Sequence, residues 1–328
     1  MEERTIIVTG IGGNVGQGIV RNLRNTGMPL RIVGTNSAPF SAGNHLVDAF
    51  HEVPFAFDPG YLDRISQIVE EESVDLIIPS TDFEVFYLAS AADRFSARLA
   101  TSGVQASGIY LDKFLTWEHH NALGIPFAKS FLPSEWSGQF ESAIAKPRKG
   151  RGSRGLLKGK FDATLLTDDE YMVQEMHAGL EITCAVFVSY LSGEITGILT
   201  MDRSLENGAT SFCRVVKDWD VQLREMAELM VRHSDLKGSF NIQAIVTEQN
   251  EVIPFEVNCR ISGTNSIRTH FGFADVAWTM QELLYNQPAP IPQIREGLAQ
   301  RILMDVIYPD AKSVSDLKRT NKDNFFLY

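Results

Sequence analysis

The chain of 328 residues contains little cysteine and no long apolar run. Its three cysteines, Cys184, Cys213 and Cys259, are far apart and form no CxxC pair, so the sequence predicts neither a zinc site nor a disulfide framework. No run of about 18 apolar residues occurs, which argues against a membrane-spanning helix. The opening residues, MEERTIIVTG, lack the apolar core and cleavage site of a signal peptide. We therefore expect a cytoplasmic protein with no membrane partner.

Positive charge is also scarce. The net charge is −11 and the sequence pI is about 5.2, which argues against a nucleic-acid partner because phosphates usually meet a basic field. One basic cluster runs from Lys146 to Arg154 and includes Arg151. It has no interleaved aromatic residues, so a flexible anion-binding loop is favoured over an RNA-binding patch. The length and the 44% hydrophobic content predict a globular protein of two to three domains.

The most informative segment contains two strand-like stretches, FNIQAIV and VIPFEVNCRI, separated by the polar residues EQNE. Their β-branched and aromatic content predicts an antiparallel hairpin. With the turn centred at residues 249–250, Gln243 lies directly across from Glu256. Because side chains alternate between the faces of a strand, Glu256, Asn258 and Arg260 share one face.

That shared face is rich in oxygen atoms and ends in a guanidinium. Amide and carboxylate oxygens suit a hard cation such as Mg²⁺, and the neighbouring Arg260 can clamp a phosphate. The alternative interpretation is an ordinary solvated sheet face. The stretch from Gly263 to Ser266 is short of large apolar residues, as is typical of a loop that closes over a ligand.

The N-terminal part predicts an open parallel sheet. The stretches TIIVTG, IGGNVGQG and LRIVGTN read as strand, glycine-rich turn with helix, and strand, and the alternation continues to about Gly108. An NAD site would need an acidic residue after the second strand, but that place holds Thr35, Asn36 and Ser37. We expect packing rather than direct ligand contact at Gly12 and Gly13.

With these features the chain resembles the ATP-grasp superfamily, and in particular the synthetase half of the large subunit of carbamoyl phosphate synthetase. The Glu-x-Asn-x-Arg pattern is the most specific part of the match. The resemblance implies that Gln243 and Glu256 bridge metal ions, that Asn258 ligates the second metal and that Arg260 contacts phosphate. Many relatives carry Glu in place of Gln243. Gly263 replaces a second arginine of the carbamoyl phosphate branch, so we expect substrates other than bicarbonate and carbamate.

The resemblance also implies a nucleotide site. Lys113 and Lys146 would contact the ATP phosphates, with Lys146 just before a glycine-rich flap loop. Glu175 and Met176 would line the adenine edge, and Glu181 would hold the ribose hydroxyls. From the residues alone, Lys113 fits a solvated helix position equally well, and Glu181 fits an exposed strand start.

Three further arginines are candidates for the substrate. Arg203 and Arg214 accompany a predicted loop over residues 204–216, which either closes over a carboxylate or is an ordinary surface loop. Arg268 is predicted to bind the substrate carboxylate and is counted with Arg260 and Lys146 among the catalytic residues.

The spacing of histidine and methionine residues in the predicted helices indicates no metal site. A helix from Asp112 to about Leu123 includes His119 and His120, which are predicted to lie on the surface. The stretch DVQLREMAELMVRHSD has apolar residues at helical spacing, so its methionines are predicted to be core residues. The tail from Arg301 onward has only loose patterning.

These observations predict an α/β protein, α+β in its C-terminal part, with a Rossmann-like domain over residues 1–108, a flap over 109–172 and a large ATP-grasp subdomain over 173–328. The implied activity is an ATP-dependent ligase that phosphorylates a carboxylate and joins it to an amine, with ATP and Mg²⁺ or Mn²⁺ as cofactors. Small-molecule carboxylate and amine substrates and a homodimer are expected. The alternatives are a nucleotide-binding regulatory protein without turnover and an NAD(P)-dependent oxidoreductase.

Overall fold

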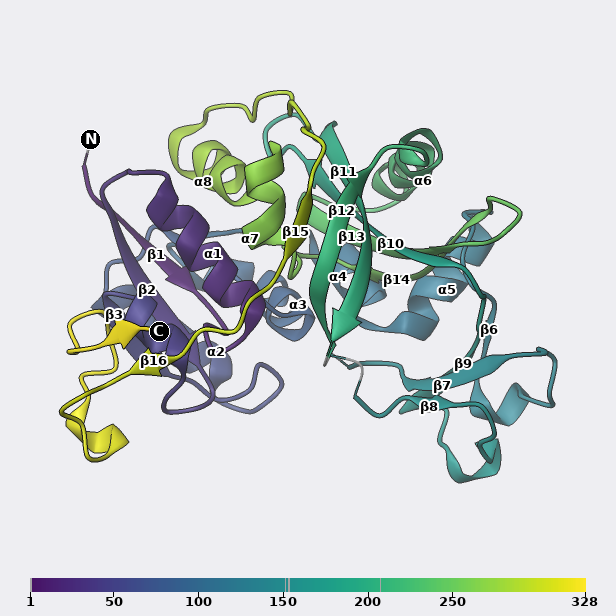
Figure 1. Ribbon diagram of the computed structural model, residues 1–328, viewed down its shortest axis with the longest axis horizontal. Coiled ribbons are helices and arrows are strands. Elements are labelled where there is room, and N and C mark those ends of the chain that lie inside the picture. Colours follow the sequence, from purple (N-terminus) through teal and green to yellow (C-terminus); the bar gives the residue numbers. More distant parts are fainter. Residues whose placement is uncertain (1, 151, 153, 207) are drawn as a thin grey trace.

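The computed structural model describes residues 2–150, 152, 154–206 and 208–328, so Arg151 of the basic cluster lies outside the described residues. A parallel N-terminal sheet and a larger antiparallel sheet lie side by side, and a small sheet projects beyond the larger one (Figure 1). The predicted α/β class with an antiparallel C-terminal part is confirmed.

The N-terminal sheet has five parallel strands in the order β3-β2-β1-β4-β5. Apolar side chains are buried on both of its faces, as expected for a parallel sheet covered by helices. The elements are β1 (Arg4–Val8), α1 (Asn14–Asn25), β2 (Leu30–Asn36), η1 (Ala42–Leu46), β3 (Ala49–Glu52), α2 (Tyr61–Glu71), β4 (Leu76–Ile78), α3 (Asp82–Ser90), η2 (Ala92–Arg94) and β5 (Arg98–Leu99).

The glycine turn is built for close packing. Gly10 has φ of 58°, and a Cβ there would lie 2.2 Å from the Ser80 hydroxyl oxygen. A Cβ at Gly16 would lie 2.6 Å from the Gly10 carbonyl oxygen. A side chain at either position would therefore collide with its neighbours, and the turn needs glycine for packing.

Two helices, α4 (Val104–Leu111) and α5 (Lys113–Ala122), lead from the N-terminal sheet into the small sheet. The small sheet has four strands in the order β6-β9-β7-β8. Its elements are β6 (Ser130–Phe131), η3 (Pro133–Glu135), β7 (Ala143–Pro147), β8 (Leu157–Lys158), η4 (Ala163–Leu165) and β9 (Tyr171–Glu175). The expected domain boundary at residue 172 falls inside β9, so the small sheet extends a few residues further.

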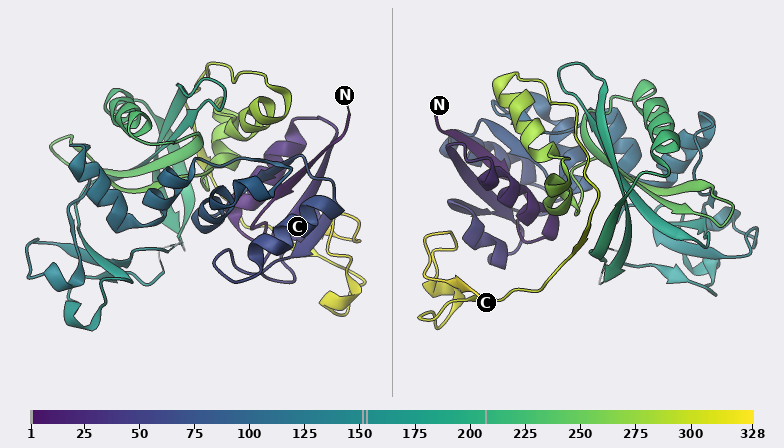
Figure 2. Two further views of the ribbon diagram at one scale, coloured as in Figure 1. Left: turned by 180° about the vertical axis from the view of Figure 1, so that it is seen from behind. Right: turned by 45° about the horizontal axis from the view of Figure 1, so that its top comes forward.

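The large sheet has six antiparallel strands in the order β14-β13-β10-β11-β12-β15. Helix α6 packs on one face, and α8 packs on the other, where it also contacts the N-terminal sheet. Figure 2 shows α8 between the two sheets. The elements are β10 (Leu180–Val188), β11 (Ile195–Glu206), β12 (Ala209–Val216), α6 (Asp220–Arg232), β13 (Gly238–Val246), β14 (Val252–Asn258), α7 (Asn265–Arg268), η5 (Thr269–Phe271), α8 (Asp275–Tyr285) and β15 (Leu298–Gln300).

The prediction of a loop over residues 204–216 is wrong. Strand β11 runs to Glu206, and β12 pairs with it from Ala209 to Val216. The sequence signal for β12 was the alternation of side chains in ATSFCRVV. Gly208, at the turn before it, has φ of 75°. Arg203 and Arg214 are therefore strand residues.

The tail returns to the N-terminal domain. It includes β16 (Val306–Ile307), η6 (Val314–Asp316) and β17 (Phe326–Leu327). Asn321 donates a hydrogen bond to Asp48, and Phe325 packs on the ring of His45. The tail thus belongs in space with the first sheet rather than with the large subdomain (Figure 1).

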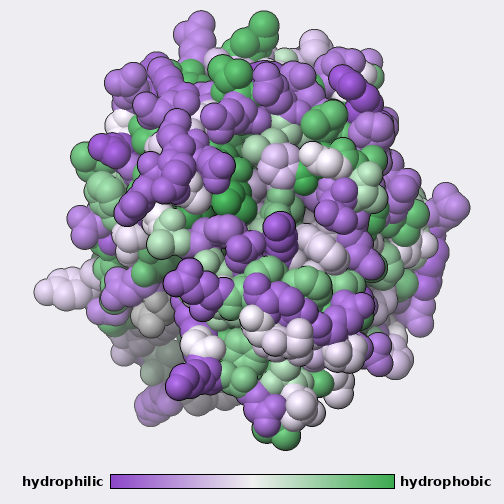
Figure 3. Space-filling model, turned by 90° about the vertical axis from the view of Figure 1, so that its right-hand side faces the viewer, coloured by the Kyte–Doolittle hydropathy of each residue, from purple (hydrophilic) through white to green (hydrophobic). Residues whose placement is uncertain are grey.

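The surface on the side of the small sheet is mixed. Figure 3 shows hydrophilic and hydrophobic side chains interspersed over this face. Within the described part of the chain, no helix has the length and apolarity that a membrane crossing requires.

Candidate functional site

The predicted hairpin forms from β13 and β14, and Gln243 pairs with Glu256. The register shifts by one residue between Gln243 and Ala244, where Ala244 pairs with Pro254. Phe255 is therefore the extra residue of a β-bulge. The bulge corrects the register: the strand pairs next to the turn are centred on residue 249, and without the bulge Gln243 would face Phe255. The oxygen-rich face depends on it.

Hydrogen bonds connect the three predicted metal ligands in a row. The Gln243 amide donates to Asn258 Oδ1 over 2.9 Å, and the Asn258 amide donates to Glu256 Oε1 over 2.9 Å. All three side chains lie on the face of the large sheet opposite to α6, whose core includes their strand neighbours Ile242 and Val257. The hairpin thus places one carboxylate and two amides together.

Lys146 reaches this group from β7 of the small sheet. Its ammonium donates to the Gln174 side chain over 2.7 Å and to the bulged carbonyl of Phe255 over 3.0 Å. Lys146 is only 4% exposed, and burial lowers its pKa to about 7, with Glu256 opposing and Lys113 assisting this decrease. A lysine that is only partly protonated near neutral pH can be fully charged by an arriving phosphate.

Glu256 remains an anion amid these cations. Burial alone would raise its pKa, but Lys113, Lys146, the Asn258 hydrogen bond and Arg260 outweigh that effect and lower the pKa. The structure therefore brings the two predicted phosphate lysines and the predicted phosphate arginine to one carboxylate. We call Lys113, Lys146, Arg260 and Glu256 the charged centre.

Lys113 and Arg260 have partners of their own. The Lys113 ammonium donates to the Gly150 carbonyl over 3.2 Å, at the start of the flap loop. Arg260 forms an ion pair with Asp82 at 3.0 Å. Asp82 begins α3 of the N-terminal domain, so this pair joins the hairpin to that domain.

Arg203 occupies a place that the sequence did not assign to it. Its guanidinium pairs with Glu181 at 2.7 Å and donates to the Gln243 side-chain oxygen. It therefore links the predicted ribose carboxylate to the predicted metal site. Arg214 instead pairs with Asp202 and its side chain is 59% exposed. The two arginines, equivalent in sequence reasoning, differ because residues 203 and 214 point to opposite faces of the sheet.

The predicted adenine residues lie at the end of β9. A Glu175 carboxylate oxygen lies 3.5 Å from the Nε2 atom of His177. The Met176 backbone N–H donates to the Ser142 carbonyl over 3.0 Å. Glu175 ends β9 and Met176 begins the connection to β10, at the junction of the small and large sheets.

Arg268 lies away from any accessible surface. It is 0% exposed and forms an ion pair with Asp275, which is also 0% exposed. It donates further hydrogen bonds to Ser262 and Thr264. These contacts favour a structural role beneath the hairpin and give no support to the predicted contact with a substrate carboxylate.

The prediction that His120 lies on the surface is wrong. His120 is 0% exposed and stacks edge-on against Tyr110 and Phe127. Burial lowers its pKa to about 3, with a smaller contribution from His119. Helix periodicity turns residue 120 toward the core, together with Thr116.

The donor set fits a cation that arrives with a nucleotide. Over the described residues, no group of three or more His, Cys, Asp or Glu side chains could hold a metal ion. Glu256, Asn258 and Gln243 together offer one carboxylate and two amides. Mg²⁺ accepts such a sparse set when phosphate oxygens and water complete its shell.

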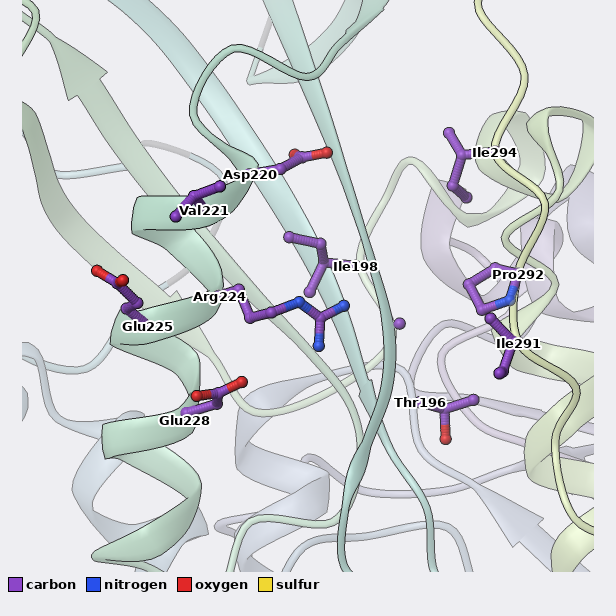
Figure 4. A pocket seen from close by; sticks show the side chains of 11 residues that line it. Thr196, Ile198, Asp220, Val221, Arg224, Glu225, Glu228, Ile291, Pro292 and Ile294 are labelled. Carbon is purple, nitrogen blue, oxygen red and sulfur yellow. The ribbon is translucent and has the colours of Figure 1, made fainter.

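A cavity of about 480 Å³ lies on the α6 face of the large sheet. It lies between α6, β11 and the segment around Pro292, and Figure 4 shows Arg224 reaching from α6 toward that segment. Ile198 and Val221 line it together with Glu225. No residue of the charged centre contributes to it.

Two family models match the chain. The first is the PylC-like N-terminal domain over residues 6–102, and the second is the ATP-grasp domain over residues 111–264. The chain therefore contains an ATP-grasp domain preceded by a PylC-like N-terminal domain. The predicted ATP-grasp domain is thereby confirmed, and no curated protein matches the chain in sequence.

Solved structures share the fold. N5-carboxyaminoimidazole synthetase from Staphylococcus aureus with ADP has a TM-score of 0.73 at 14% identity, covering 92% of this chain and 82% of that one. Carboxyaminoimidazole ribonucleotide synthase from Aspergillus clavatus with ATP has a TM-score of 0.70 at 16% identity, covering 90% and 81%. The biotin carboxylase domain dimer of 2-oxoglutarate carboxylase from Hydrogenobacter thermophilus, with MgADP, ADP and bicarbonate, has a TM-score of 0.68 at 14% identity, covering 90% and 73%.

Proposed function

We propose that this ATP-grasp protein is an ATP-dependent ligase that phosphorylates a carboxylate and joins it to an amine. The observation that supports this most directly is the charged centre. Lys113, Lys146 and Arg260 converge on the ionised Glu256 within the matched ATP-grasp domain. Three cations can hold a polyphosphate while one carboxylate anchors its metal. Structural relatives that were solved with ADP or ATP support nucleotide binding by this fold.

Each residue then has a proposed task. Glu256, Asn258 and Gln243 would hold Mg²⁺ or Mn²⁺, which when bound neutralises charge on the phosphates. Lys113, at the start of α5, and Lys146, on β7, would bind the phosphates, because the charges of both ammonium groups act on Glu256.

The remaining nucleotide contacts follow from the connection between the two sheets. Glu175 and Met176 would line the adenine edge. Glu181 would receive the ribose hydroxyls, and for this its pairing with Arg203 must loosen. These assignments are expectations that mutation of each residue can test.

Arg203 is proposed to bind the substrate carboxylate in place of Arg268. Arg203 lies on the same face as Gln243 and its side chain is 10% exposed, whereas Arg268 is sealed. A guanidinium can hold a carboxylate with two parallel hydrogen bonds. The carboxylate would then lie close to the phosphates.

The reaction proceeds in two steps. A carboxylate oxygen attacks the γ-phosphorus of ATP, the bond from that phosphorus to the ADP oxygen breaks, and an acyl phosphate and ADP form. The amine nitrogen then attacks the acyl carbon, the carbon–oxygen bond to phosphate breaks and an amide forms. A substrate ammonium loses two protons overall, one to the departing phosphate and one to solvent. Lys146 and Arg260 would stabilise the charge that develops on the transferred phosphoryl group.

A nucleotide-binding protein without turnover is the second candidate. The Gln243 oxygen already accepts a hydrogen bond from Arg203, and the centre holds a single carboxylate ligand. These features suit nucleotide binding as well as catalysis. The predictions of a homodimer and of a partner set without nucleic acid stay predictions.

Trapping of the acyl phosphate separates the two candidates. The protein is incubated with MgATP, pooled small carboxylates and hydroxylamine, and the hydroxamate and ADP are measured. A ligase forms both in equal amounts, and the pool can then be divided to identify the carboxylate. MgATP binding with neither product across broad pools would favour the regulatory binder.

A further inference from the structure

Arg301 is a half-buried cation that the proposed mechanism does not use. It directly follows β15, and its backbone N–H donates to the Ser211 carbonyl over 2.8 Å, so it continues the pairing of β15 with β12. Its guanidinium donates through Nη2 to the Gly263 carbonyl. The Nε atom is buried and has no hydrogen-bond partner among the described residues. A buried N–H group without an acceptor is rare in native proteins and indicates that water or a ligand supplies one.

The register of the large sheet places Arg301 on the same face as Arg203. Arg203 pairs with Cys213 across β11 and β12, and Cys213 pairs with Ala299 across β12 and β15. Paired residues share a face, and so do residues two positions apart, which extends this face from Ala299 to Arg301. Two strand spacings, about 10 Å, separate Arg203 from Ala299. Arg301 therefore lies on the far side of Arg203 from the hairpin strands β13 and β14.

A second arginine adds positive charge at this place. Burial lowers the pKa of Arg301, and the positive charge of Arg21 on α1 lowers it further. A Cβ at Gly263 would lie 3.1 Å from the amide nitrogen of Asn14, so α1 lies against the loop that Arg301 contacts. Arg21 shares a helix face with Asn14, because seven residues make about two turns. Two cations thus lie where the chain that leaves β15 passes α1 (Figure 1).

No carboxylate of the described residues offsets these two charges. Neither Arg21 nor Arg301 forms an ion pair with any of them. The Nε atom of Arg21 donates to the Gln17 carbonyl of its own helix over 3.3 Å, and its side chain is exposed. Carboxylates are abundant in a chain of net charge −11, so two neighbouring arginines without one are unusual here. Their mutual repulsion decreases when an anion binds between them.

From this arrangement we infer that Arg301 and Arg21 bind a second anionic group of the carboxylate substrate. The inference rests on the proposed ligase function. The reacting carboxylate lies at Arg203, and the second group, a carboxylate or a phosphate, lies at Arg301. The free Nε–H of Arg301 and the remaining Nη2–H form an edge that can hold two oxygen atoms. The site thus selects a substrate with two anionic groups, and Arg21 adds charge from the N-terminal domain.

The test compares glutarate with its monomethyl ester, which has the same chain and one charge fewer. 4-Phosphonobutanoate replaces the second carboxylate with a phosphonate, and succinate and adipate vary the chain length. Affinities are measured by calorimetry with MgADP present, so that no turnover occurs. The proteins are the native form, Arg301→Met, Arg301→Lys, Arg21→Met and the control Arg232→Met. Arg232 is an exposed arginine in the last turn of α6.

We expect the native protein and Arg232→Met to bind glutarate about tenfold more tightly than the monoester. Arg301→Met should remove most of this preference, and Arg301→Lys should restore part of it, because lysine keeps the charge without the two-oxygen edge. Arg21→Met should reduce the preference by a smaller factor, because an exposed charge is screened. Whichever of glutarate and 4-phosphonobutanoate binds more tightly identifies the second group. Thermal unfolding of each variant checks that the fold is retained.

Three results would overturn the inference. They are equal affinity of the native protein for glutarate and its monoester, an unchanged preference in Arg301→Met, and absence of binding by every doubly charged probe. Failure of the proposed function is distinguishable, because hydroxamate and ADP are measured on the same samples. Hydroxamate formation from monocarboxylates, with no charge preference in binding, would overturn only the second anion site. A preference that depends on Arg301, with neither ADP nor hydroxamate formed, would preserve the anion site and remove its role in a ligase.

Discussion

The two faces of the large sheet differ in chemistry. The α6 face borders a cavity of about 480 Å³, in which Arg224 lies among apolar and acidic side chains. The opposite face gathers Lys146 and Arg260 around Glu256. The difference teaches that volume alone does not locate chemistry. Ionised groups held close together under partial burial are better evidence of a reactive site, because burial amplifies their interactions.

The same comparison separates residues by what their loss should change. Residues on the hairpin face should change activity, except where they are sealed within the core. Substitutions on the α6 side should change stability or have no effect, and should leave activity unchanged. The five predictions below test this division.

The largest effect is expected for Arg268→Leu, which is sealed beneath the hairpin face. The substitution would leave the Asp275 carboxylate buried without its ion pair, at a cost of about 3–5 kcal/mol in the free energy of unfolding. Urea denaturation measures it. Arg214→Leu, which removes an exposed arginine from β12, is the control and should cost less than about 1 kcal/mol. Similar values for the two variants would contradict the structural role of Arg268.

Lys146→Met should abolish most of the activity without unfolding the protein. Methionine preserves the length of the side chain, but the ammonium beside Glu256 is lost. We expect ADP formation to fall by about 10²- to 10³-fold, measured with the carboxylate found by trapping. Lys129→Met serves as a control in the neighbouring strand region. A reduction below about tenfold for Lys146→Met would remove this residue from the charged centre.

His120 should make stability fall in acid. Its pKa is about 3 in the folded protein and about 6.5 when unfolded, so the unfolded chain binds the proton more readily. Stability from this residue is therefore present above pH 6.5 and decreases as pH falls toward 3. Between pH 6.5 and pH 5 the loss is about 2 kcal/mol. Urea midpoints at both pH values should differ less in His120→Phe than in the native protein, and equal differences would contradict the assignment.

Arg203→Ala and Arg214→Ala form a matched pair on adjoining strands. Arg203 touches Glu181 and Gln243, whereas Arg214 pairs with Asp202 away from the charged centre. Arg203→Ala should raise the carboxylate KM about tenfold, and Arg214→Ala should change it by less than about twofold. Steady-state kinetics with varied carboxylate measures both. Equal effects would show that the two strand faces are not functionally distinct.

The smallest effect is expected on the α6 face. Arg224→Ala removes an arginine that lines the cavity beside α6. Because the sheet separates that cavity from the charged centre, activity should stay within about twofold of the native value. A large loss of activity would show that the cavity takes part in the reaction.

The hairpin could be predicted because its signal is local. Alternation over FNIQAIV and VIPFEVNCRI fixes which residues share a face, whereas the pairing of Gln243 with Glu256 also depends on the bulge. The bulge at Phe255 could not be predicted, because it depends on how the turn from Thr247 to Glu251 closes. The carbonyl that Phe255 offers to Lys146 was therefore unforeseen.

Long-range contacts explain the other differences. Arg260 and Asp82 are 178 positions apart in sequence, so no local pattern indicates their ion pair. Sequence alone does not distinguish an arginine that forms a buried ion pair from one that binds a ligand, so Arg268 was predicted to bind the substrate. Asp275, seven positions later, was the available clue, since a carboxylate at that separation can return to the arginine across a short turn.

The central claim is that Glu256 lies at the point of phosphoryl transfer. The most direct measurement compares substrate-dependent ADP formation by the native protein, by Glu256→Gln and by Glu251→Gln, which lies in the exposed turn of the same hairpin. The account predicts full activity for Glu251→Gln and a loss of about 10²-fold or more for Glu256→Gln. Near-native ADP formation by Glu256→Gln would contradict it.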